Sequence, residues 1–238
     1  MLNFRIVLVE PIYSGNVGSV ARVMKNFGFS DLILLNPCEL DTPARVMSVH
    51  AYEIIENARI EFSLNDALKG SNIIIGMTGL PGKTDNKHFR IPAYSPEQLK
   101  EKLSGNSGII SLVFGREDSG LRNEELEFCD MIVNIPTNPV YPSMNLSHAV
   151  AVVLYELSDV KSGDRYLAEH FDIELLYEHI DEILDDIEYK EHKEDKTKLM
   201  LRRILGRAEL TAREVQTLRG ILRRIQWKLR TGEYGKSD

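Results

Sequence analysis

The sequence predicts an α/β domain built on a mostly parallel sheet, followed by a small α-helical C-terminal extension. Short apolar runs of strand length alternate with segments of helical periodicity over the first 160 residues. The runs are rich in Val, Ile and Leu, as expected for strands that are covered on both faces. Beyond residue 172 only helical periodicity remains. We therefore expect a domain over 1–160, a linker over 161–172 and the extension over 173–238.

The expected strands and helices follow one another in a regular order. The strands are expected at 5–9, 32–35, 73–77, 109–114 and 131–135. Apolar residues recur at helical spacing after the first strand until Gly28, a residue typical of a helix C-cap. A helix over 44–56 should turn four side chains inward: Val46, Val49, Ile54 and Ile55. Further helices are expected at 96–103, 123–128 and 149–157, and in the extension at 173–189 and 199–229.

Composition excludes several classes of protein. With 238 residues, 43% of them hydrophobic, the chain can bury a substantial core. Its two cysteines, Cys38 and Cys129, lack CxxC spacing, so we predict neither a disulfide framework nor a metal site. No apolar run reaches the about 18 residues that indicate a membrane span. We expect a cytoplasmic protein without a membrane partner.

Charge is distributed unevenly along the chain. The net charge of −7 argues against a generally basic nucleic-acid binder. However, acidic residues dominate 172–195, and nearly every charge over 196–230 is positive. The basic side chains could contact RNA phosphates, or they could neutralise the acidic segment before them, and the sequence leaves both readings open. Trp227 is a candidate packing anchor for this part of the chain.

The first motif is a glycine-containing turn that follows the first strand. It reads Gly-Asn-x-Gly-Ser-x-Ala-Arg and contains Asn16 and Arg22. Such a turn can offer backbone N–H groups and a polar side chain to an anion or a sugar. It lacks the GxGxxG spacing and the lysine of dinucleotide and P-loop sites. The alternative is that the glycines merely shape the turn and that Arg22 is solvated.

Two further motifs follow later strands. Val-Phe-Gly-Arg-Glu-x-x-Gly-Leu, over 113–121, is a strand that ends in a polar loop, where ligands of parallel sheets bind. Its Arg116 and Glu117 could instead form an ordinary surface ion pair. Ser119 lacks the context of a hydrolase nucleophile. Ser-Met-Asn-Leu-Ser-x-Ala, over 143–149, joins a Pro-rich loop to an N-capped helix.

These three motifs, in this order and at these separations, resemble the signature motifs of the SPOUT superfamily of RNA methyltransferases. The resemblance covers roughly 4–157. It is strongest to the TrmH/TrmJ branch of 2′-O-ribose methyltransferases, and within it to the TrmJ type, which methylates position 32 of tRNA. It implies a C-terminal trefoil knot, S-adenosylmethionine as cofactor, tRNA as partner and a homodimer. The alternatives are an rRNA 2′-O-methyltransferase and a non-catalytic knotted RNA-binding protein.

The resemblance also implies roles for individual residues. The cofactor pocket would be formed by Met77, Thr78, Gly79, Gly115, Glu117, Ile135, Pro142, Ser143 and Met144. The catalytic residues would be Arg22, Asn16, Ser143 and Asn145. The family assigns activation of the hydroxyl to the arginine, but a guanidinium is a poor base. We therefore expect Arg22 to orient the ribose or a phosphate, and His148 to have a structural or exposed role.

Overall fold

The computed structural model describes residues 1–79 and 90–231, without the side chains of residues 191 and 192. The last residues of the expected extension, 232–238, therefore lie outside the description. The strands are β1 (Leu2–Val9), β2 (Asp31–Leu35), β3 (Arg59–Glu61), β4 (Ile73–Thr78), β5 (Ala93–Tyr94), β6 (Asn106–Phe114), β7 (Met131–Asn134) and β8 (Arg165–Tyr166). The helices are α1 (Ser14–Asn26), α2 (Thr42–Ser48), α3 (Tyr52–Glu56), α4 (Leu64–Leu68), α5 (Pro96–Leu103), α6 (Asn123–Glu127), α7 (Leu146–Leu157), α8 (His170–Asp186), α9 (Glu191–Ala208) and α10 (Ala212–Thr231).

The described strands form one parallel sheet, as predicted. Its order is β3-β2-β1-β6-β4-β7-β5, and β8 pairs with the start of β6. All the paired strands run in the same direction. The carboxyl ends of β1, β6, β4 and β7 therefore meet at one edge, and the loops that follow these strands lie beside one another.

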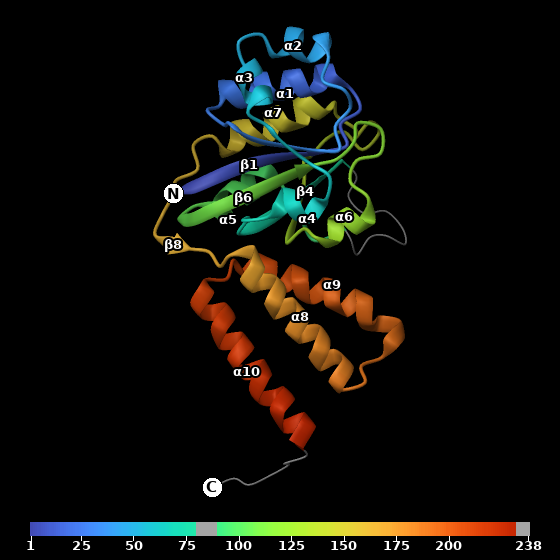
Figure 1. Ribbon diagram of the computed structural model, residues 1–238, viewed down its shortest axis with the longest axis vertical. Helices are drawn as coiled ribbons and strands as arrows, with labels where there is room; N and C mark the ends of the chain where they lie inside the picture. Colours follow the sequence, from blue (N-terminus) through green and yellow to red (C-terminus); the bar gives the residue numbers. More distant parts are fainter. Residues whose placement is uncertain (80–89, 232–238) are drawn as a thin grey trace.

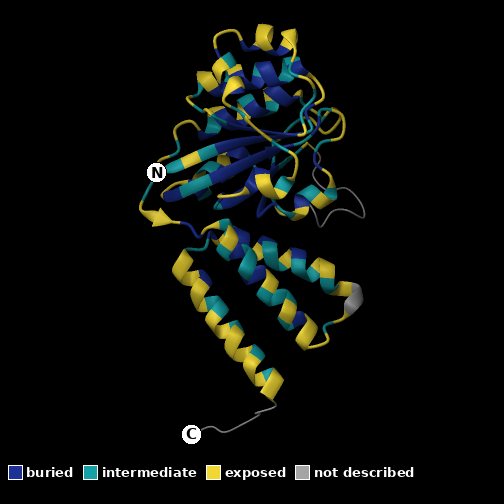
Figure 2. Ribbon diagram, viewed as in Figure 1, coloured by how far each residue is buried: buried dark blue, intermediate teal, exposed yellow. Residues whose placement is uncertain are grey.

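Helices cover both faces of the sheet (Figure 1). Successive residues of β1 alternate between two apolar clusters: Ile6 packs in the cluster that includes α1, α5 and α7, and Val7 packs in the one that includes α4 and the end of α6. Figure 2 shows the resulting buried strands between helices that are exposed on their outer sides. Burial on both faces is the physical reason why these strands read as continuous apolar runs.

The prediction of a single helix over 44–56 is wrong in one respect, because the chain forms two short helices there. The break is at Val49, whose φ of 54° lies in the left-handed region. Val49 and Val46 were expected to point inward, but they are 49% and 64% exposed. Ile54 and Ile55 are buried as predicted. The change of direction at Val49 lets α2 pack on α1 while α3 reaches the sheet.

The single helix expected over 199–229 is also interrupted. The chain turns at Glu209, whose φ is 52°, so that α9 and α10 are separate helices. The Glu209 carboxylate is buried and accepts a 2.8 Å hydrogen bond from the Asn106 side chain, and Lys102 lies 3.2 Å away. These contacts fix the turn against β6. Trp227 is not a packing anchor, because it is 42% exposed.

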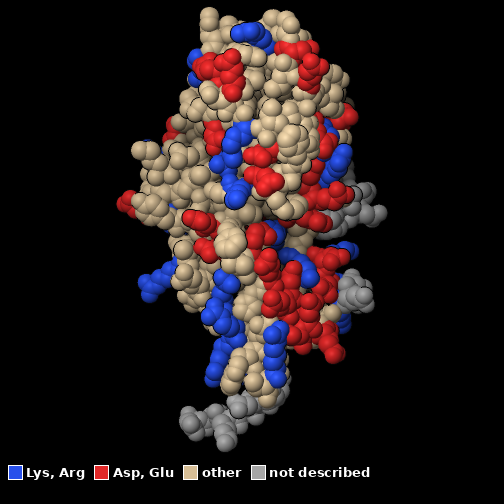
Figure 3. Space-filling view, viewed as in Figure 1, with Lys and Arg blue, Asp and Glu red and all other residues tan. Residues whose placement is uncertain are grey.

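The helices α8, α9 and α10, called the helical extension from here on, enclose a third apolar cluster. Figure 3 shows Lys and Arg gathered along one side of the extension and Asp and Glu beside them. Arg202 donates to the Glu174 carboxylate from its two terminal guanidinium nitrogens, at 2.5 and 2.8 Å, and Arg230 contacts Asp186. These pairs support neutralisation of the acidic segment. Other basic side chains are exposed on α10: Arg213, Arg223, Arg224 and Lys228.

The expected linker, 161–172, lies against the sheet. Gly163 donates from its N–H to the Asn106 carbonyl at 3.1 Å, and the Leu167 N–H donates to the Ser107 carbonyl at 3.2 Å. A Cβ on Gly163 would lie 2.2 Å from the Gly105 carbonyl oxygen, so the two backbones touch. In the described part of the chain, none of the helices is long and apolar enough to cross a bilayer.

Replacing Gly18 with Ala should destabilise the protein, because α1 and α2 touch backbone to backbone there. A Cβ on Gly18 would lie 2.2 Å from the Ala44 carbonyl oxygen. We expect the free energy of unfolding, measured by urea denaturation, to fall by roughly 1–3 kcal/mol. Gly15→Ala is the matched control, since the nearest atom to its Cβ would be 3.6 Å away. Equal unfolding midpoints for the two variants would contradict this account of the contact.

Candidate active site

A cavity of 380 Å³ opens at the carboxyl ends of β4, β6 and β7. Every residue predicted for the cofactor lines it: Met77, Thr78, Gly79, Gly115, Glu117, Ile135, Pro142, Ser143 and Met144. Apolar walls are added by four residues that were not predicted to contact the cofactor: Phe114, Leu121, Val133 and Leu146. The parallel sheet brings these distant segments together because each follows a strand that ends at the same edge.

The loop after β6 is held tightly by its own backbone. A Cβ on Gly115 would lie 2.1 Å from the Gly120 carbonyl carbon, so no side chain fits there. Arg116 and Gly120 exchange two backbone hydrogen bonds, at 2.9 and 3.3 Å. By contrast, a Cβ on Gly79 would meet only the Pro142 carbonyl oxygen, at 3.8 Å, which is an ordinary contact. The surrounding protein therefore excludes a side chain at Gly115 but not at Gly79.

Arg116 does not form a surface ion pair with Glu117, which the sequence left as an alternative. Its guanidinium is buried, binds both carboxylate oxygens of Glu125 at 2.7 and 3.0 Å, and binds Glu10 at 2.7 Å. The hydrogen bonds to Glu125 and Glu10 raise the pKa of Arg116, and the bond from Arg116 lowers the pKa of the Glu10 carboxyl. Neither partner of Arg116 could be identified from apolar periodicity, because Glu10 and Glu125 come from segments that are far apart in the sequence.

Glu117 joins the first two motifs instead. One carboxylate oxygen accepts from the Ile12 N–H at 2.8 Å, and the other accepts from the Asn16 side-chain amide at 2.9 Å and from the Tyr13 N–H at 3.3 Å. The carboxylate thus fixes the start of α1. It does so across a separation of 101 residues between Asn16 and Glu117.

Asn145 extends this connection to the third motif. Its side-chain amide donates to the Asn16 carbonyl oxygen at 3.0 Å, and its own oxygen caps α7 by accepting from the Ser147 N–H at 2.9 Å. Glu117, Asn16 and Asn145 therefore form one chain of hydrogen bonds, which we call the Glu-Asn-Asn chain. It orients two of the predicted catalytic side chains, Asn16 and Asn145. Both the oxygen and the nitrogen of the Asn16 side chain have hydrogen-bond partners in it.

A second, shallower cleft of 580 Å³ adjoins the cavity. It shares Glu117, Ser143 and Met144 with the cavity, and Asn16 and Asn145 line it. Its other lining residues include two exposed aromatic side chains that the sequence argument missed, Tyr13 and Tyr141. Among the described residues that line the cavity and the cleft there is no His, Cys or Lys.

Arg22 is not brought to this group of residues. It lies on the exposed side of α1 and lines neither the cavity nor the cleft. It is seven residues after Gly15, which lines the cleft, so the two share one face of the helix about two turns apart. His148 is exposed, in agreement with the expected structural or exposed role.

Comparison with known proteins identifies the family. Residues 3–155 match the SpoU rRNA Methylase family, and residues 171–234 match the tRNA methyltransferase TrmJ, C-terminal domain. The tRNA (cytidine-2′-O-)-methyltransferase TrmJ of Methanocaldococcus jannaschii is 42% identical over 90% of this chain and 95% of its own. The tRNA (cytidine/uridine-2′-O-)-methyltransferase TrmJ of Pectobacterium atrosepticum is 36% identical over 94% and 97%.

A solved structure agrees with this assignment. The crystal structure of TrmJ from Z. mobilis ZM4 superposes with a TM-score of 0.76 at 27% identity, over 93% of this chain and 98% of that one. These matches confirm the resemblance that the three motifs predicted. The chain therefore belongs to the SpoU methylase family of RNA methyltransferases.

Proposed function

We propose that the protein transfers a methyl group from S-adenosylmethionine to a ribose 2′-hydroxyl of tRNA. The observation that carries this proposal is that a cofactor-sized cavity and an open cleft adjoin and share Glu117, Ser143 and Met144. A donor in the cavity and an RNA nucleotide in the cleft would meet at these residues. The relatives that are 42% and 36% identical are named tRNA 2′-O-methyltransferases, and this supports tRNA as the substrate.

The cavity suits S-adenosylmethionine in size and chemistry. Its 380 Å³ lies within the range of about 300–1,000 Å³ that is usual for ligand pockets. Phe114, Leu121 and Val133 provide apolar walls for a flat adenine, and the loops at 77–79 and 142–144 provide main-chain groups. The missing side chain at Gly115 lets the backbone of Gly120 and Leu121 pack closely beside the cavity. When bound, the cofactor supplies a methyl group on a positively charged sulfur that departs readily.

The residues of the cleft would act by positioning. Asn16 and Asn145 are fixed by the Glu-Asn-Asn chain, so they present a rigid polar surface beside Ser143. Holding the hydroxyl oxygen in line with the methyl group lowers the activation barrier by several kcal/mol, on the order of the effect of good orientation in intramolecular reactions. Arg22 lies about two turns along α1 from the cleft, so it would orient the ribose or a neighbouring phosphate of an RNA that extends from the cleft along this helix.

We further propose the finer features that the resemblance implies. The chain would form a deep trefoil knot after β6 and would assemble into a homodimer. Its target would be nucleotide 32 of the anticodon loop, and it would act in the cytoplasm. The methyltransferase domain would span 1–160, the linker 161–172 and the helical C-terminal part 173–238. The placement of β7 between β4 and β5 supports a chain that threads back through the sheet. Exposed apolar side chains on α2 and α7, among them Val46 and Tyr155, support a contact between copies.

One experiment tests the proposed function. The protein is incubated with S-adenosylmethionine labelled in its methyl group and with either total tRNA or rRNA, and the modified nucleoside is then mapped. We expect label in tRNA, as a 2′-O-methyl nucleoside at position 32. Label in rRNA alone would favour the rRNA methyltransferase, and no transfer to either RNA would refute the enzyme.

Replacing Arg22 with Lys should slow methylation by about tenfold or more, because an ammonium cannot reproduce the two-pronged contact of a guanidinium with a phosphate or ribose. Cofactor affinity, measured by calorimetry, should stay unchanged, since Arg22 lies outside the cavity. Arg59→Lys, on the exposed edge strand β3, is the matched control. Normal methylation by Arg22→Lys would remove Arg22 from the site.

Replacing Glu117 with Gln should lower kcat by roughly 10- to 100-fold, the cost of a misplacement of about 1 Å. A Gln amide places an N–H donor where Glu117 now accepts from Ile12 or from Asn16, so one of these contacts becomes repulsive. The variant should remain folded in a thermal melt. Glu124→Gln, an exposed carboxylate on α6, is the control. Unchanged kcat for Glu117→Gln would show that the Glu-Asn-Asn chain does not position the reacting groups.

A further inference from the structure

A buried arginine of the helical extension binds the backbone at the end of α6. Arg203 of α9 is 3% exposed. Its guanidinium donates to the Leu126 carbonyl at 2.7 Å and to the Cys129 carbonyl. Carbonyls at the C-terminal end of a helix lack partners within the helix, so a charged donor stabilises them. The extension thereby holds the segment that joins α6 to β7.

The next turn of α9 touches the same segment. A Cβ on Gly206 would lie 2.6 Å from the Asp130 Cβ, so α9 lies against the backbone there. The Asp130 carboxylate in turn accepts from the Ile74 N–H at 2.8 Å. Ile74 belongs to β4, three residues before Met77 of the cofactor cavity. Contacts from α9 thus reach the start of two strands, β4 and β7, whose other ends line that cavity.

A series of covalent and polar links connects Arg203 to the loop over 115–120, which lines the cavity and is called the cofactor loop from here on. Glu125 precedes Leu126 in α6 and binds Arg116 through both carboxylate oxygens. Arg116 in turn closes the loop from Gly115 to Gly120 through its backbone and its side chain. A shift of α6 would therefore move the Glu125 carboxylate away from Arg116.

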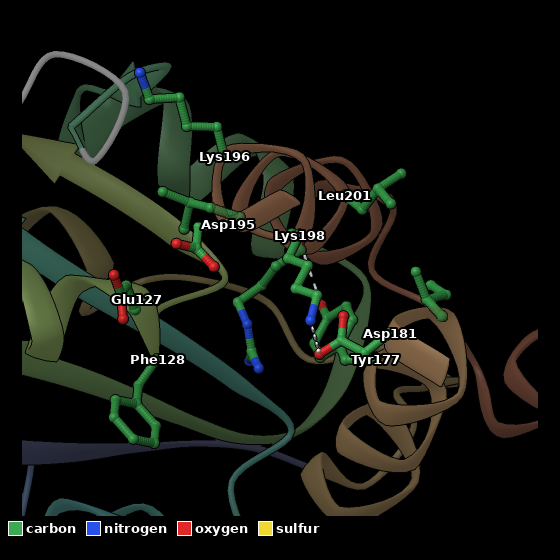
Figure 4. Close-up of a pocket in the computed structure, with 11 residues that line it drawn as sticks. Glu127, Phe128, Tyr177, Asp181, Asp195, Lys196, Lys198 and Leu201 are labelled. Carbon is green, nitrogen blue, oxygen red and sulfur yellow. Dashed lines mark hydrogen bonds and ion pairs between the residues drawn. The ribbon is translucent and has the colours of Figure 1, made fainter. Parts of the chain in front are cut away.

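A cavity separates the end of α6 from part of the helical extension. It has a volume of 640 Å³, lies between α6, α8 and α9, and is lined at the end of α6 by Glu127 and Phe128 (Figure 4). Of the charged groups around it, Lys198 contacts Asp181 at 3.6 Å. Their mixed signs specify no ligand. The support of α6 from the extension therefore rests on Arg203 rather than on continuous packing.

We propose that Arg203 is a positioning residue for methyl transfer. It holds α6 in place, α6 presents Glu125 to Arg116, and Arg116 sets the shape of the cofactor loop. The helical extension is then a structural part of the cofactor site, in addition to any contact it makes with RNA. This inference rests on the proposed function, because it concerns the same cavity and the same cofactor.

Arg203→Met tests the proposal in the full chain. It keeps an apolar stem of similar length but removes both donors. We expect the dissociation constant for S-adenosylmethionine, measured by calorimetry, to rise at least about tenfold, since two charge-assisted hydrogen bonds no longer hold α6. KM for the cofactor should rise in parallel, while KM for tRNA stays within about twofold. Arg203→Lys, which keeps one donor at a time, should recover part of the cofactor affinity.

The controls separate this proposal from general destabilisation and from the proposed function. Arg207→Met, one turn further along α9, should bind the cofactor as the unaltered protein does. If Arg203→Met melts below the assay temperature, Arg203→Lys and Gly206→Ala are measured in its place, and each should weaken cofactor binding more than tRNA binding. Unaltered cofactor affinity, or equal losses for cofactor and tRNA, would overturn the role of Arg203. Failure of the unaltered protein to bind S-adenosylmethionine would refute the proposed function instead.

Discussion

The Glu117 carboxylate is the contact on which the site depends. It accepts from two backbone N–H groups before α1 and from Asn16, and Asn16 accepts from Asn145. The start of α1 is thereby held to two segments that lie more than 100 residues further along the chain. An ionised carboxylate is suited to this task because it accepts several hydrogen bonds at once, and such bonds are stronger than those between neutral groups. The same contact forms the boundary between the cavity and the cleft.

The parallel sheet makes this contact possible. Parallel strands place all their carboxyl ends at one edge, so loops from β1, β6 and β7 meet although long stretches of chain separate them. Close backbone contacts at Gly18 and Gly115 then bring the elements nearer than side chains would allow. The buried Arg116 compensates for the charge of Glu10 and Glu125 next to the loop. Rigid loops on a rigid sheet are what positioning of a reacting hydroxyl requires.

The helical extension is tied to this framework at several points. The linker pairs with β6, the turn at Glu209 is anchored to Asn106, and Arg203 binds the end of α6. These contacts are polar and partly buried, so their geometry is specific. The extension therefore contacts both β6 and α6 through specific hydrogen bonds.

The sequence by itself determined the parallel α/β architecture, the helical extension and the family, because apolar periodicity and motif spacing are local properties of the chain. The family resemblance that the motifs carry also indicated which residues line the cavity. The breaks at Val49 and Glu209 could not be predicted, because a non-glycine residue with positive φ has no sequence signature and is held by tertiary contacts. Only the tertiary structure decided that Arg116 binds Glu10 and Glu125, that Arg22 lies apart from Asn16, and that Arg203 supports α6. Each of these depends on side chains from distant segments meeting in a buried environment, where partner and distance decide the energy of a charge.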